Sequence, residues 1–151
     1  MNDRAYLEKA IELSRESVER GGFPAGAIVV KESKILASGV SSGNQLNDPT
    51  SHAEIEAIRK ACHQLKTTDL SDTTMYSSME PCLMCYGATE WSNIPRVVYA
   101  CAREKLSQQH FEGDHNLAEI NRQSLRPVEL VHLQELEQLA LGVVEDWEKA
   151  K

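Results

Sequence analysis

Apolar residues recur every three or four positions near both ends of the chain, a pattern that predicts an amphipathic helix in each region. The first helix covers residues 2–20 and the last covers residues 135–149. Two more helices are expected between them, one running to about residue 65 and one beginning at Pro81, a residue that suits the first helical turn. The candidates for capping the earlier of these two are Asp48, Thr50 and Ser51.

Short runs rich in β-branched and aromatic residues alternate with these helices and predict five strands. They are residues 27–30, 34–37, 73–78, 96–102 and 128–133. The polar stretch 38–49 is predicted to be a loop, and the stretch 104–126 a loop with helical turns and a short helix near 116–122. Helices that alternate with strands indicate an α/β fold, a three-layer α/β/α sandwich, in a single domain covering residues 1–151.

Composition and charge limit the kinds of molecule that the protein is expected to bind and the compartment in which it is expected to act. The chain has 151 residues, of which 41% are hydrophobic and 26% charged, and its formal net charge is −7. Proteins that hold a phosphate backbone usually carry a basic surface, so nucleic acid is disfavoured as a partner. No run approaches the ~20 apolar residues of a membrane span, and the first twenty residues lack the apolar core of a secretory signal. With four cysteines, two of them spaced C-x-x-C, we expect a cytoplasmic protein whose cysteines bind metal or do redox chemistry.

Two motifs carry the chemistry. His52 is followed two positions later by Glu54, and Pro81-Cys82 is followed by Cys85. One histidine and two cysteines are the types and number of ligands that catalytic Zn²⁺ takes from a protein, and each motif is predicted to lie at a helix N-terminus, which stabilises thiolates. Glu54 is then the expected general acid and base, which takes a proton from water and delivers it to a ring nitrogen and a departing amine.

Two other interpretations compete with a catalytic zinc site. The C-x-x-C pair alone is also typical of thiol redox proteins, and a closed structural zinc site would need a fourth ligand, for which Cys62 and Cys101 are candidates. Both of these cysteines are interpreted instead as small buried apolar residues. The remaining histidines are interpreted as surface or hydrogen-bonded side chains; they are His63, His110, His115 and His132.

With these motifs, residues 7–101 resemble the cytidine deaminase superfamily, and most closely its guanine deaminase and tRNA adenosine deaminase branch. The resemblance implies a five-stranded mixed sheet in an α/β/α sandwich, one zinc per subunit and a homodimer. It also implies that the backbone of Ala53 and Ser78 holds the amine or ring, and that Asp114 and Trp91 belong to the substrate site, although Asp114 is equally typical of a solvated loop.

Two positions depart from the family pattern. Ser41 stands where the family usually has a base-binding Asn, so Asn44 is a candidate to supply the missing donor and acceptor, and Ala25 stands where guanine deaminases have an aromatic residue. We therefore expect a zinc-dependent hydrolase that deaminates a small base, with guanine or a related purine favoured over cytosine-type pyrimidines and tRNA adenosine. The alternative outside the enzymes is a catalytically silent, zinc-bearing subunit that binds a base or a partner. The presence of Glu54 argues against it.

Overall fold

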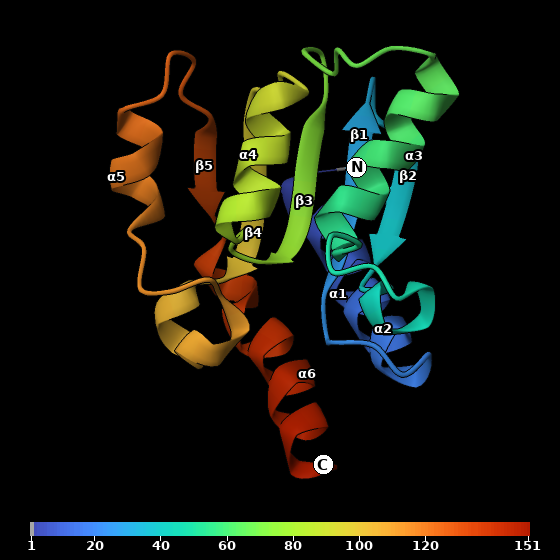
Figure 1. Ribbon diagram of the computed structural model, residues 1–151, viewed down its shortest axis with the longest axis vertical. Coiled ribbons are helices and arrows are strands. Elements are labelled where there is room, and N and C mark those ends of the chain that lie inside the picture. The colour runs from blue at the N-terminus through green and yellow to red at the C-terminus, as the bar shows by residue number, and fades with distance from the viewer. Residues whose placement is uncertain (1) are drawn as a thin grey trace.

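A five-stranded mixed sheet forms the centre of the protein in a computed structural model that describes residues 2–151 (Figure 1). β1 is antiparallel to both β2 and β3, whereas β3, β4 and β5 run parallel to one another. This confirms the predicted mixed sheet. In sheet order the strands are β2 (Lys34–Val40), β1 (Gly26–Lys31), β3 (Thr74–Met79), β4 (Arg96–Cys101) and β5 (Glu129–His132).

Helices cover both faces of the sheet and complete the expected three layers (Figure 1). Successive side chains of a strand point to opposite faces, so Ile28 belongs to one apolar cluster and Val29 to the other. The first cluster joins the sheet to α1 (Asp3–Glu19) and α6 (Glu137–Lys149). The second joins it to three helices, α3 (Ala53–Leu65), α4 (Leu83–Trp91) and α5 (Leu117–Arg122).

The polar stretches contain more regular structure than the sequence predicted. β2 continues to Val40, and residues 43–46 form a single helical turn, α2 (Gly43–Leu46), so the prediction of a loop over 38–49 was wrong at both places. The short helix near 116–122 is confirmed as α5. The part of the chain that the structure describes also contains three 3₁₀ turns, η1 (Arg103–Lys105), η2 (Gln108–His110) and η3 (Gln134–Leu136). None of the helices within residues 2–151 combines the length and apolar character that crossing a membrane requires.

The start of α3 lies directly on β2 because Gly39 has no side chain. A Cβ atom at Gly39 would lie 2.1 Å from the carbonyl oxygen of Ala53 and 2.8 Å from the amide nitrogen of Ala57. Neither backbone atom could move without shifting the helix. Gly39 thus sets the position of the first turn of α3, which carries His52 and Glu54 into the site.

Candidate active site

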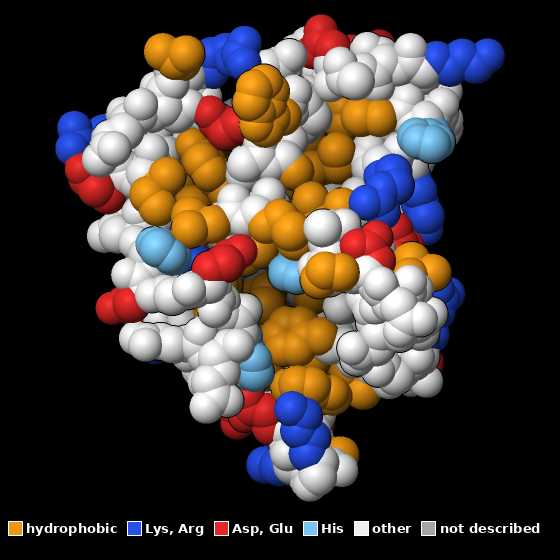
Figure 2. Space-filling view, in the orientation of Figure 1, with side chains coloured by type: hydrophobic (Ala, Val, Ile, Leu, Met, Phe, Trp, Pro, Cys, Tyr) orange, Lys and Arg blue, Asp and Glu red, His pale blue; other side chains and the backbone are white. Residues whose placement is uncertain are grey.

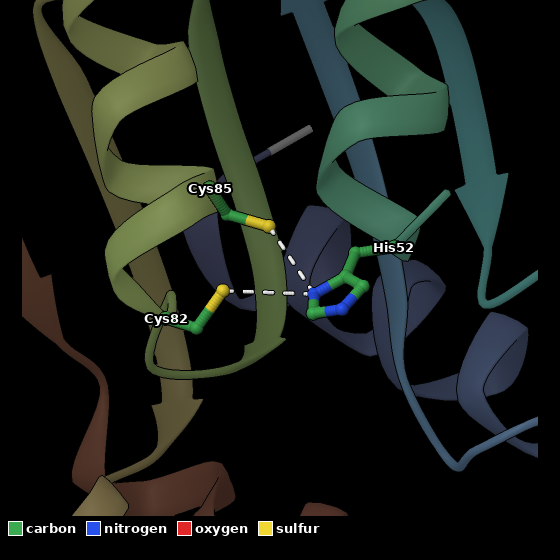
Figure 3. Close-up of side chains that lie close together, drawn as sticks. All are labelled: His52, Cys82 and Cys85. Atoms are coloured by element: carbon green, nitrogen blue, oxygen red, sulfur yellow. Dashed lines mark hydrogen bonds between the residues drawn. The ribbon is translucent and has the colours of Figure 1, made fainter. Parts of the chain in front are cut away.

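Two helix N-termini meet at the carboxyl ends of the parallel strands, and the three predicted ligands lie there (Figure 3). His52 is the N-cap of α3, Cys82 is the N-cap of α4, and Cys85 lies in the first turn of α4. Cys82 therefore lies one position before the helix in which the sequence placed it. Neither cap side chain bonds to a backbone N–H of its own helix, so the imidazole and the thiol are free to face each other.

The spacing of the donor atoms fits a tetrahedral zinc ion. Nδ1 of His52 lies 3.6 Å from Sγ of Cys82 and 3.6 Å from Sγ of Cys85. Zn–N bonds of about 2.05 Å and Zn–S bonds of about 2.3 Å at tetrahedral angles would separate N and S by about 3.6 Å. Among residues 2–151 the group of metal-binding side chains consists of these three residues, without Cys62 or Cys101. Three donors match a catalytic site, whereas a closed structural site takes four.

The pKa values of the two thiols are shifted in opposite directions. The hydrogen bond from Cys85, together with that from His52, lowers the pKa of Cys82 to about 5 in spite of its burial. The same bond to Cys82, with burial, raises the pKa of Cys85 well above its ordinary value. The hydrogen bond to Cys82 also raises the pKa of His52. One thiolate is therefore present at neutral pH before any metal binds, and metal binding would release the second thiol proton.

Glu54 is buried beside these ligands, with 4% of its surface exposed. Burial is the main cause that raises the pKa of its carboxyl group to about 7, and the charge of Cys82 adds to the effect. A carboxyl group that titrates near neutral pH can both accept and donate a proton under working conditions. Glu54 thus has the acidity expected of a general acid and base.

A pocket of about 230 Å³ opens onto Glu54. Figure 2 shows a hollow in the middle of this face of the molecule, with hydrophobic side chains in its floor. Its walls come from five separate parts of the chain: the loop before β1, the end of β2, the start of α3, the end of β3 with the turn before α4, and η2 with the residue that follows it. The residues are Phe23, Ala25, Ser41, His52, Ala53, Glu54, Met79, Glu80, Cys82, Gln109, His110 and Phe111.

Comparison with known proteins agrees with this geometry. Residues 1–101 match the family described as "Cytidine and deoxycytidylate deaminase zinc-binding region". The chain belongs to this family. It is 40% identical over 123 residues to the guanine deaminase of Bacillus subtilis (strain 168), covering 81% of this chain and 79% of that protein. It is 37% identical over 105 residues to the tRNA-specific adenosine deaminase of Aquifex aeolicus (strain VF5), covering 70% of each.

A solved structure has the same fold. It is a mutant of the protein NE0047 in complex with 8-azaguanine, and it aligns with a TM-score of 0.88 and 25% identity over 99% of this chain and 86% of that one. The cytidine deaminase-like α/β fold and the resemblance stated from the motifs are thereby confirmed. The protein is an enzyme of the hydrolytic nucleobase deaminase class.

The structure brings together only part of the substrate site that the resemblance implied. Ala53 and Ser41 line the pocket. The other four residues lie elsewhere and are not in its lining. Ser78 is buried and accepts a hydrogen bond from the Gly26 N–H at 3.1 Å, and Asn44 lines an adjoining groove. Asp114 lines a different hollow beside Arg103, and Trp91 is 86% exposed at the far end of α4.

Sequence reasoning missed half of the pocket lining. Phe23, Met79 and Glu80 lie within or beside the recognised motifs but were given no role, and Gln109, His110 and Phe111 come from a stretch without periodicity. Two signals were available for this stretch: the aromatic pair at 110–111 among polar residues, and the resemblance of residues 111–114 to guanine deaminases. The position of these residues depends on contacts far apart in the chain, which no local pattern encodes.

Proposed function

We propose that the protein catalyses the hydrolytic deamination of guanine or a related purine, with release of ammonia and with zinc as its cofactor. The observation that carries the proposal is the buried carboxyl group of Glu54 in a pocket that also contains His52 and Cys82. The similarity to a guanine deaminase supports the choice of base.

The zinc ion would be held by His52, Cys82 and Cys85, whose donor spacing suits it. When bound, it would lower the pKa of a water molecule so that hydroxide forms at neutral pH. Glu54 takes the proton released from water at its carboxylate. It passes this proton to a ring nitrogen. It then takes the remaining proton from the hydroxyl group on the attacked carbon and passes it to the exocyclic amine, so that water and the amino-substituted base become the oxo base and ammonia.

The pocket itself favours a free base over a polynucleotide. Its volume is about 230 Å³ and most of its lining side chains are apolar or neutral. Ser41 and the backbone of Ala53 are the predicted residues within reach of a bound ring, while roles for Ser78, Asn44, Asp114 and Trp91 would require contacts from outside the pocket lining. A net charge of −7 also disfavours a phosphate backbone.

Deamination of adenosine in tRNA is the second candidate, because the chain is 37% identical to a tRNA-specific adenosine deaminase. The two functions differ in one measurable way. A tRNA enzyme would retard tRNA at low salt, and the complex would dissociate as salt is raised.

We also propose that the protein is a cytoplasmic homodimer. Two large apolar side chains are exposed beside the far end of α4: Trp91 is 86% exposed and Leu125 is fully exposed, and the residues next to them in sequence, Glu90 and Ser124, are hydrogen-bonded to each other. A second copy of the chain packed against this end of the molecule would cover both side chains. Four free cysteines suit a reducing compartment. Sedimentation of the wild type and of Trp91→Glu tests the dimer, and an unchanged monomer in both would contradict it.

The enzyme assay is ammonia release from a panel of guanine, adenine, cytosine, their nucleosides and tRNA. We expect guanine or a related purine to give the highest kcat/KM. Glu54→Gln, which keeps the shape of the side chain, should retain about one zinc per chain and lose at least about 100-fold in kcat. Unchanged turnover in this variant would overturn the role of Glu54, and zinc-free protein purified without chelator would overturn the role of the metal.

A further inference from the structure

Three aromatic rings from distant parts of the chain pack together at the edge of the pocket. The ring of Phe23 lies 4.9 Å from that of His110 and 5.2 Å from that of Trp147, measured between centroids. The rings of His110 and Trp147 are 5.9 Å apart. Phe23 and His110 both line the pocket, whereas Trp147 lies behind them on α6. The end of the last helix therefore supports one wall of the pocket.

A carboxylate fixes the histidine in this wall. Nε2 of His110 lies 3.2 Å from Oε1 of Glu148, and the His110 side chain is only 13% exposed. A carboxylate only accepts hydrogen bonds, so Nε2 carries the proton of this contact. A wall that only excluded water would not need a histidine held in one orientation, because a bulky apolar residue would fill the same space.

Small residues occupy the pocket beside this wall. Ala25 and Ser41 line it with short side chains, and Ala53 adds another on the side of α3. Space next to a ring of fixed orientation suits a flat heterocycle, because stacking on an aromatic face is favourable for any base.

We infer that His110 binds the planar ring of the substrate, and that Glu148 and Trp147 are positioning residues which act through it. The inference rests on the proposed function, because it assigns recognition of the base to the same pocket. The substrate class is a flat heteroaromatic ring that is small enough for the pocket and stacks on the imidazole. The C-terminal helix thereby contributes to substrate specificity as well as to the core.

Steady-state kinetics of substitutions in the wall test the inference. His110→Ala should raise KM for the preferred base about tenfold, in the range measured for loss of one stacking side chain, and leave kcat within about threefold. His110→Phe keeps an aromatic ring but loses the bond to Glu148, so its KM should fall between those of the wild type and His110→Ala. Glu148→Ala should raise KM in the same direction, and Glu148→Gln, whose amide oxygen can still accept from Nε2, should restore it. Glu145→Ala, an exposed change on the same helix, is the matched control.

Binding without turnover gives a second readout. In a Glu54→Gln background, the fluorescence of Trp147 should change when the base is added, and the change should disappear with Trp147→Phe or weaken with His110→Ala. A wild type that turns over the base while His110→Ala and Glu148→Ala keep its KM would overturn the inference. If no base yields ammonia, the proposed function fails. A saturable change in Trp147 fluorescence on addition of a base would still support base binding at His110. If no base in the panel changes the Trp147 fluorescence, base binding at His110 is refuted.

Discussion

Glu112 caps the helix that carries the two cysteines: its Oε1 accepts a hydrogen bond from the backbone N–H of Leu83 at 3.1 Å. The other oxygen accepts from the N–H of Met84 at 3.2 Å. Cys82, the N-cap of α4, leaves these N–H groups unbonded because its thiol faces His52. A carboxylate 29 residues after Leu83 takes the capping role and leaves the side chain of Cys82 free to bind a metal.

Loss of this cap should loosen α4 where it carries the ligands. We expect Glu112→Ala to reduce the free energy of unfolding by about 1 kcal/mol, within the range measured for N-caps, and to weaken zinc binding in competition with a chelator. Thermal unfolding and chelator titration measure the two effects. Glu104→Ala, an exposed glutamate on the preceding turn, should change neither. Equal zinc affinity in Glu112→Ala and wild type would show that the cap does not order the site.

The ligands and the pocket wall differ in how far the sequence predicts them. His52 and Glu54, like the two cysteines, are close in sequence and start helices that follow clear turn signals, so their position follows from local structure. The loop that carries Glu112 has no such pattern. It is held by Arg103, which donates to the carbonyl of His115 at 2.6 Å and packs its guanidinium 4.3 Å from the Phe111 ring centre.

The substrate residues were less predictable for the same reason. Trp91 and Asp114 were expected in the site from resemblance alone, without a spacing that requires it, and both lie outside the pocket lining. His110 was interpreted as an ordinary surface or hydrogen-bonded residue, and its partners come from a helix near the other end of the chain. Contacts of this kind depend on tertiary packing, which single-residue preferences do not contain.

Gly39→Ala should damage the site through the backbone. The added Cβ would collide with the carbonyl of Ala53, so α3 must shift away from β2. We expect a loss of about 1–3 kcal/mol in unfolding free energy, as for other overpacked positions, together with lower kcat/KM. Gly142→Ala is the control, because a Cβ there meets nothing within 4 Å and alanine favours the helix by about 0.5–1 kcal/mol. A Gly39→Ala enzyme as stable and active as wild type would contradict this close packing.

Stability at acid pH should depend on Asp3. Arg96 donates to its two oxygens at 2.9 and 2.6 Å, and these bonds chiefly lower the pKa of Asp3 below its ordinary 3.8. The stabilisation is therefore complete above about pH 4 and disappears as pH falls through the lowered pKa. Asp3→Asn should lower the free energy of unfolding by up to about 1 kcal/mol at pH 7, the value for a solvent-screened ion pair. At the lowest pH it should leave this free energy unchanged. Urea unfolding of the wild type and Asp3→Asn at a series of pH values measures this difference, with Asp146→Asn as the control. If the two proteins still differed in unfolding free energy in strong acid, the Asp3–Arg96 pair would not be its cause.

Metal removal should separate the two helix N-termini that the ligands join. His52 caps α3 and both cysteines lie at the start of α4, so a shared ion would tie the two helices together. A ligand that binds only the folded state at about 1,000 times its Kd adds about 4 kcal/mol of stability. Chelation should therefore lower the Tm and abolish ammonia release, and added zinc should restore both. His52→Ala should already have the lower Tm and should not respond to the chelator. A wild type whose Tm is the same with and without zinc would show that these three residues do not bind it in the folded protein.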